Sequence, residues 1–179
     1  MHQQIADEIL SMAMKDQELR FRVEKPKDNQ ALWQQITDID RQSSRLMKRV
    51  VREIGWPTIS KVGTKASQAA WLLVQHSPDL AFQKQCLNLM RRVGEGDVNR
   101  GNIAYLTDRV RMREGQPQVY GTQFVQSKEN PNMWEPYQIE DQKNMPRLRE
   151  AMALNTIEEN MAEINNIGST GTKQSGLMD

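Results

Sequence analysis

The strongest constraint on the fold is an apolar stripe between residues 32 and 50. Its members stand at alternating steps of four and three: Leu32, Ile36, Ile39, Ser43 in the place of an apolar residue, Leu46 and Val50. This spacing is typical of a helix with one buried face. Pro26 ends the preceding helix and Asp28 caps this one. The helix is expected to end at Ile54, because Gly55 suits a left-handed C-terminal position and Pro57 cannot continue it.

Similar spacing predicts helices along most of the chain. They cover residues 3–24, about 65–76, about 78–93, about 102–113, 145–153 and 156–166. The helix within "KASQAAWLLVQH" is apolar nearly all round, which is typical of a buried central helix. Ser77 and Pro78 indicate that the next helix begins there, with Ser as its N-cap. Thr156 and Glu159 have the spacing of a capping box.

Residues 118–140 depart from the helical pattern. "QVYGTQFVQ" is rich in β-branched and aromatic residues, "KENPN" is a turn cluster, and "MWEPYQIE" reads as a returning strand. Pro136 restricts that strand to an edge. We therefore predict a mainly α protein, a single-domain helical bundle with one small β-hairpin near residues 118–140. An amphipathic helix occupies residues 1–25, the helical domain spans 28–166, and 167–179 form a disordered tail.

Composition excludes several classes of function. The 179 residues fit one domain, and a net charge of +1 argues against binding to nucleic acid. No apolar run is long enough to cross a membrane, and the N-terminus lacks the features of a signal peptide, so a cytoplasmic protein is expected. Cys86 is the only cysteine and there are two histidines. These numbers argue against disulfides and a zinc site, so we expect neither metal nor cofactor.

Polar residues that could carry chemistry gather at three places: 56–61, Gln75–His76, and 105–124. If these places converge on one pocket, His76 is a general base near neutral pH. Asp108 would orient it or accept a substrate donor, and Arg109 would hold a carboxylate or phosphate. The remaining substrate-binding candidates are Trp56, Lys61, Gln75, Tyr120 and Gln123.

Each candidate also has a purely structural interpretation. His76 can be a hydrogen-bonding side chain, or a cation that faces the C-terminal end of the helix dipole. Asp108 and Arg109 can belong to an ordinary network of ion pairs. Tyr120 can anchor the hairpin on the core, and Trp56 can be a wedge between two helices.

Several separated motifs occur in a fixed order: "GWP" at 55–57, "VG" at 62–63, "AWLLVQH" at 70–76, "YLTDR" at 105–109 and "GQPQVYGTQ" at 115–123. The chain resembles a bacterial family of uncharacterised proteins, a domain of unknown function, over about residues 30–153. The resemblance points to the eight candidate residues as positions that match family motifs, and it implies no activity. Residues 1–25 and the tail lie outside the resemblance.

Three functions are compatible with this sequence. One is a metal-independent enzyme that acts on a small polar or anionic metabolite by His76 acid–base chemistry. Another is a non-catalytic module that binds a small molecule or peptide, which the amides of Gln75, Gln118 and Gln123 favour. A third is a structural interaction protein, with a homo-oligomer formed through residues 3–24; alternatively that helix folds back on its own core.

Overall fold

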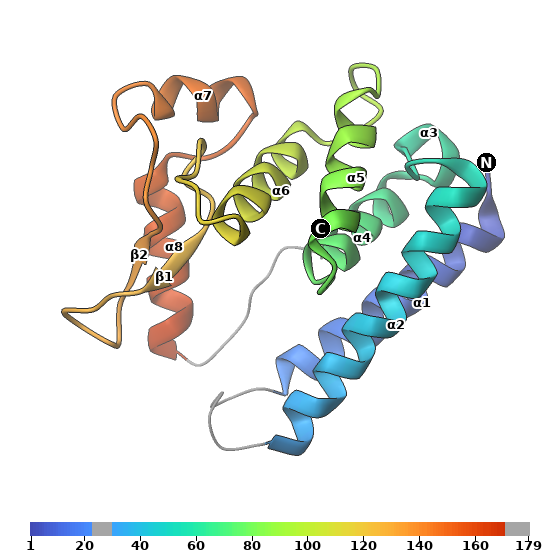
Figure 1. The fold of residues 1–179 in the computed structure, drawn as a ribbon, viewed down its shortest axis with the longest axis horizontal. Helices are drawn as coiled ribbons and strands as arrows, with labels where there is room; N and C mark the ends of the chain where they lie inside the picture. The colour runs from blue at the N-terminus through green and yellow to red at the C-terminus, as the bar shows by residue number, and fades with distance from the viewer. Residues whose placement is uncertain (23–29, 171–179) are drawn as a thin grey trace. The chain divides into compact units, whose positions relative to one another are not determined.

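The described part of the chain divides into two compact units. The computed structural model describes residues 1–22 and 30–170 (Figure 1). The N-terminal unit comprises residues up to Asn99, and the C-terminal unit begins at Arg100. The expectations for Pro26 and Asp28 lie outside the described residues, as does the predicted tail from residue 171 onward.

The N-terminal unit consists of helices. They are α1 (Gln3–Phe21), α2 (Gln30–Ile54), α3 (Ile59–Val62), α4 (Thr64–Gln75) and α5 (Leu80–Arg91). In Figure 1, α1 and α2 lie side by side along most of their length, and α4 packs against both of them and against α5. Ala70 and Leu73 of α4 are fully buried, which confirms that this helix is central.

The apolar stripe of α1 is used within its own chain. Ile5, Ile9 and Ala13 are buried, and α1 packs on α2 and α4. This is the alternative in which the helix folds back on its own core. A homo-oligomer through residues 3–24 stays a prediction.

Two helix starts in this unit differ from the sequence-based expectation. α5 begins at Leu80 rather than at Pro78, because the Asp79 side chain accepts a hydrogen bond from the backbone N–H of Phe82 at 3.0 Å. The short helix α3 was not predicted. Its second residue, Ser60, donates its backbone N–H and its hydroxyl to the distant carboxylate of Asp97, at 2.5 and 2.7 Å.

The C-terminal unit combines helices with the predicted hairpin. Its elements are α6 (Arg100–Arg113), β1 (Phe124–Gln126), β2 (Trp134–Pro136), α7 (Met145–Ala151) and α8 (Ile157–Thr170). The two strands pair antiparallel, with Phe124 opposite Pro136. The mainly α fold with one small hairpin is thus confirmed, and α8 runs four residues beyond its predicted end.

The predicted capping box at the start of α8 is present. The backbone N–H of Thr156 donates to the Glu159 carboxylate at 2.9 Å, and the N–H of Glu159 donates to the Thr156 hydroxyl at 3.2 Å. Local sequence is enough to define this helix end.

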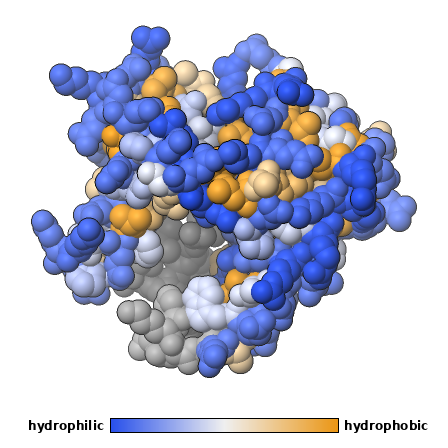
Figure 2. Space-filling view, viewed as in Figure 1, coloured by the Kyte–Doolittle hydropathy of each residue, from blue (hydrophilic) through white to orange (hydrophobic). Residues whose placement is uncertain are grey.

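Hydrophilic side chains dominate the face shown in Figure 2. A few large apolar side chains are exposed as well: Met1, Met14, Phe21, Trp33, Met133 and Trp134. Within residues 1–22 and 30–170, no helix has both the length and the apolar character needed to cross a membrane.

Candidate functional site

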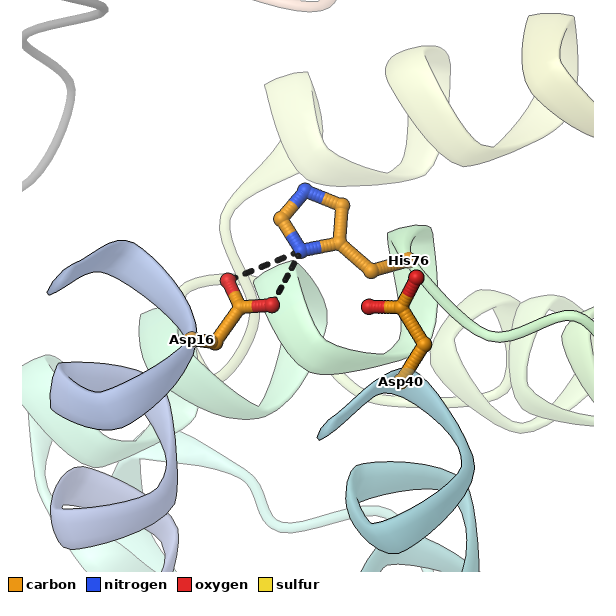
Figure 3. A group of neighbouring side chains, drawn as sticks. All are labelled: Asp16, Asp40 and His76. Atoms are coloured by element: carbon orange, nitrogen blue, oxygen red, sulfur yellow. Dashed lines mark hydrogen bonds and ion pairs between the residues drawn. The ribbon is translucent and has the colours of Figure 1, made fainter. Parts of the chain in front are cut away.

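His76 lies at the C-terminal cap of α4 and contacts a buried carboxylate of α1. Its backbone N–H donates to the carbonyl of Leu72 at 3.2 Å, which holds the residue at the end of the helix. Its Nδ1 lies 3.0 and 3.2 Å from the two carboxylate oxygens of Asp16 (Figure 3). Asp16 is 0% exposed, so the imidazole covers a charge that has no access to water.

Two further charged residues complete this arrangement. Arg20, one turn after Asp16 on α1, donates from Nε to Asp16 at 3.0 Å and from Nη2 to Asp40 of α2. Gln17 donates its amide to the other Asp16 oxygen at 2.8 Å. We call Asp16, Arg20, Asp40 and His76 the His76 cluster. Three helices contribute to it, so it exists only in the folded N-terminal unit.

The electrostatics of the two carboxylates differ. Burial raises the pKa of Asp16, but the hydrogen bond and charge of His76 and the charge of Arg20 together outweigh it, so the pKa lies below its ordinary value. Burial also raises the pKa of Asp40, and there Arg20 and His76 do not compensate fully. Asp16 is therefore the better stabilised anion of the two.

The cluster contains the donor atoms of a metal site. Asp16, Asp40 and His76 each offer an oxygen or nitrogen, and these atoms lie within 4.8 Å of one another. In this arrangement, however, the guanidinium of Arg20 already bonds to both carboxylates. A metal ion would have to displace Arg20 from both of them. The geometry fits an imidazole among charged partners better than a metal centre.

Trp56 and Lys61 hold the turn between α2 and α3. The ammonium of Lys61 donates to the carbonyls of Ile54 and Trp56, at 2.5 and 3.2 Å, and so caps the C-terminal end of α2. Gly55 between them has φ +71°, the left-handed conformation expected from the sequence. Trp56 is buried, and its interpretation as a wedge between two helices stays a prediction.

Gln75 is a buried amide next to His76 in the chain. It is 4% exposed, and among the described residues neither its amide nitrogen nor its amide oxygen has a hydrogen-bond partner. Its backbone carbonyl accepts from the side chain of Gln83 at 3.0 Å. A buried amide without partners costs about 1–3 kcal/mol, so Gln75 is a strong candidate to bind a polar group.

Asp108 stabilises a loop of its own unit. It is 0% exposed, and its carboxylate accepts the backbone N–H groups of Val119, Tyr120 and Thr122 at 2.8 to 3.1 Å, together with the Thr122 hydroxyl at 2.9 Å. Burial raises the pKa of Asp108 despite these bonds. The carboxylate thus fixes the backbone from residue 119 to 122.

Arg149 of α7 binds the carbonyl side of the same loop. Its Nη1 donates to the carbonyls of Tyr120 and Gly121 at 2.7 and 3.1 Å, and its Nε donates to the carbonyl of Asn155 at 2.7 Å. Arg149 is 2% exposed. Asp108 therefore binds N–H groups of this loop, and Arg149 binds carbonyl groups of the same loop.

Gln118 and Gln123 close the loop by pairing with each other. The Gln118 amide donates to the carbonyl of Gln123 at 3.0 Å and accepts from its N–H at 2.8 Å. The Gln123 side chain donates to the Thr122 hydroxyl at 3.2 Å.

Tyr120 in this loop and Arg109 on α6 are half-buried.

The eight predicted site residues are divided between the units. Trp56, Lys61, Gln75 and His76 belong to the N-terminal unit, and Asp108, Arg109, Tyr120 and Gln123 to the C-terminal unit. A single pocket formed by both sets stays a prediction. The carboxylate that contacts His76 is Asp16.

Asp16, Arg20 and Asp40 are not among the candidate residues that the sequence singles out. A signal for Asp16 was present, since it continues the buried face of α1 three residues after Ala13. A charged residue on an apolar stripe requires a partner when the helix packs. The partner could not be identified because His76 is sixty residues away in the chain.

These features define a mainly helical protein in which an imidazole is paired with a buried carboxylate. The chain belongs to a family of unknown function (DUF6624), whose model matches residues 3–168. The match includes α1, so the expectation that the first 25 residues lie outside the family is wrong. Comparison with the curated proteins and with the solved structures gives no match.

Proposed function

We propose that the protein is an enzyme that moves a proton on a small polar metabolite, with His76 as the acid–base group. The observation that carries this proposal is the pairing of His76 Nδ1 with the buried carboxylate of Asp16. An imidazole whose one nitrogen donates to a carboxylate has a defined tautomer, and its other nitrogen accepts the proton. Nε2 is thus the reactive atom.

The surroundings of Asp16 support this role. Gln17 and Arg20 bind the carboxylate oxygens, so the acceptor for Nδ1–H is held in one orientation. The lowered pKa of Asp16 keeps it ionised, the state in which it accepts that hydrogen bond. Asp16 is a positioning residue, because it acts through His76.

The cluster is sheltered and still reachable. The side chain of His76 is 16% exposed, while Asp16 is completely buried. A general base must be able to contact its substrate, and the carboxylate that orients it should be shielded from water. Such a carboxylate–imidazole pair performs proton transfer without a metal.

Non-catalytic binding of a small molecule is the second candidate function. The observation that favours it is Gln75, whose buried amide atoms have no partner among the described residues. Amides bind polar ligands well and do little proton chemistry. Under this function a ligand leaves the protein unchanged.

The test is to incubate the purified protein with a small-molecule extract and follow conversion by mass spectrometry. His76→Gln is expected to slow conversion by about 10²- to 10⁴-fold, because it removes the proton acceptor. The matched control is His2→Gln, which changes the other, exposed histidine. Unchanged conversion in a folded His76→Gln protein would refute the enzyme, and recovery of an unaltered ligand would favour the binding module.

A further inference from the structure

We infer that the ligand of the His76 cluster carries a positively charged nitrogen, an amine or an amidine, which binds the carboxylate of Asp40. This inference rests on the proposed function and specifies the substrate class of that site. The sequence-based expectation was a small polar or anionic ligand, and its anionic part depended on Arg109 of the other unit.

The charges of the cluster do not balance. Asp16 and Asp40 contribute two negative charges and Arg20 contributes one positive charge. With a neutral imidazole, the form that serves as a base, the cluster carries a net charge of −1. A cationic group would balance it, whereas a carboxylate or phosphate would add repulsion.

Asp40 has unused hydrogen-bonding capacity. The oxygens of Asp16 accept from Gln17, Arg20 and His76. At Asp40, Arg20 donates to Oδ1, and no donor within the described residues bonds to Oδ2. A partly buried carboxylate with a free oxygen attracts a donor more strongly than an exposed one does.

Asp40 is also placed where a ligand can reach it beside the imidazole. Figure 3 shows its carboxylate beside His76 and opposite Asp16, and one oxygen or nitrogen of each of these three residues lies within 4.8 Å of the others. The Asp40 side chain is 19% exposed, against 0% for Asp16. A ligand nitrogen on Asp40 would therefore lie close to the imidazole without entering the buried pair.

Arg20 does not offer an equivalent site for an anion. Its Nε and Nη2 donate to Asp16 and Asp40, so its charge is shared between two carboxylates. An anion that bonded to its remaining N–H groups would lie close to the carboxylates of Asp16 and Asp40 and would be repelled by both. The cluster thus discriminates by charge.

The experiment uses two probes of equal length and opposite charge, n-butylammonium and butyrate, at constant ionic strength. Proton and carbon NMR signals of the His76 ring report binding to the full-length protein. We expect a saturable shift with n-butylammonium, weakened by about tenfold or more in Asp40→Asn, since a charge-assisted hydrogen bond is lost. The matched control is Asp38→Asn, on the same helix and with a side chain that is 50% exposed, where butylammonium binding should not change.

Two results would overturn the inference. A saturable shift with butyrate alone would show that the site selects anions. No shift with either probe would show that the cluster is an internal ion-pair network that binds no charged ligand. Neither result would refute acid–base catalysis, which fails only if His76→Gln leaves conversion unchanged.

Discussion

Asp16 and Asp108 are two completely buried carboxylates with opposite surroundings. Asp16 pairs with side chains that are themselves charged or titratable, namely His76 and Arg20. Asp108 pairs with the backbone N–H groups of Val119, Tyr120 and Thr122 and with the Thr122 hydroxyl. Accordingly the pKa of Asp16 lies below its ordinary value and that of Asp108 above it.

The comparison shows that burial does not by itself identify a reactive carboxylate. Backbone donors have fixed positions, so Asp108 fixes the path of a loop. When the partner is a side chain that can itself gain or lose a proton, as His76 is for Asp16, the carboxylate instead orients that side chain. Four changes test whether the two aspartates differ in this way.

Removal of Asp108 should have the largest effect on stability. Asp108→Ala leaves the N–H groups of Val119, Tyr120 and Thr122 without their acceptor, at a cost of about 4 kcal/mol in the free energy of unfolding. Urea unfolding measures this. Asp108→Asn retains an acceptor oxygen and should cost clearly less; equal stability of Asp108→Ala and wild type would contradict a loop-holding role.

Replacement of Arg149 should have the second-largest effect on stability. We expect Arg149→Met to lower the free energy of unfolding by about 3 kcal/mol. The substitution keeps an apolar stem but removes the donors to the carbonyls of Tyr120 and Gly121. Thermal and urea unfolding can be compared with the control Arg147→Met, an exposed arginine of the same helix. If both variants lose the same small amount, Arg149 does not support the loop.

Asp16→Asn should cost about 2 kcal/mol, because His76 and Arg20 then have a neutral amide in place of the carboxylate as their partner. It should also reduce any conversion that depends on His76, whereas Asp108→Asn is expected to act mainly through stability. Asp7→Asn, an exposed position of α1, is the matched control. A folded Asp16→Asn protein with full conversion would remove Asp16 from the mechanism.

The smallest expected effect is on the pH dependence of stability. The folded pKa of Asp16 lies below 3.8, so its contribution is present above pH 3.8 and is lost as the pH falls through the folded value. The folded pKa of Asp108 lies above 3.8, so stability declines as the pH rises from 3.8 through that value.

Lowering the pH should therefore shrink the destabilisation caused by Asp16→Asn and enlarge that caused by Asp108→Asn. Urea unfolding of the wild type and both variants, at several pH values around 3.8, measures the two trends. Parallel trends would mean that the pKa values of the two carboxylates are shifted in the same direction, against this account.

Much of the fold could be predicted because its signals are local. The stripe of α2, Gly55 at its end and the capping box of α8 each depend on residues within a few turns of one another. The start of α5 was placed too early, since Asp79 competes successfully with Ser77 as the cap. α3 was missed because its stabilising contact, from Asp97, comes from far along the chain.

Of the His76 cluster, the sequence singles out only His76, together with its neighbour Gln75. A polar pair at the end of an apolar helix stands out in a sequence, and both residues are indeed at the end of α4. Asp16 and Asp40 lie on amphipathic helices that carry many charges, and only packing shows which carboxylate meets the imidazole. Contacts between three helices that are far apart in the chain produce no regular spacing in the sequence, so no sequence pattern predicts them.

The most direct test of the central claim is the tautomer of His76, read from the nitrogen NMR signals of its ring at a pH where the ring is neutral. We predict that Nδ1 carries the proton and Nε2 the lone pair, because Asp16 accepts from Nδ1. Asp16→Asn should weaken this preference, and Asp7→Asn should not. A wild-type ring protonated at Nε2 would contradict the account, since the atom assigned to proton transfer would already hold its proton.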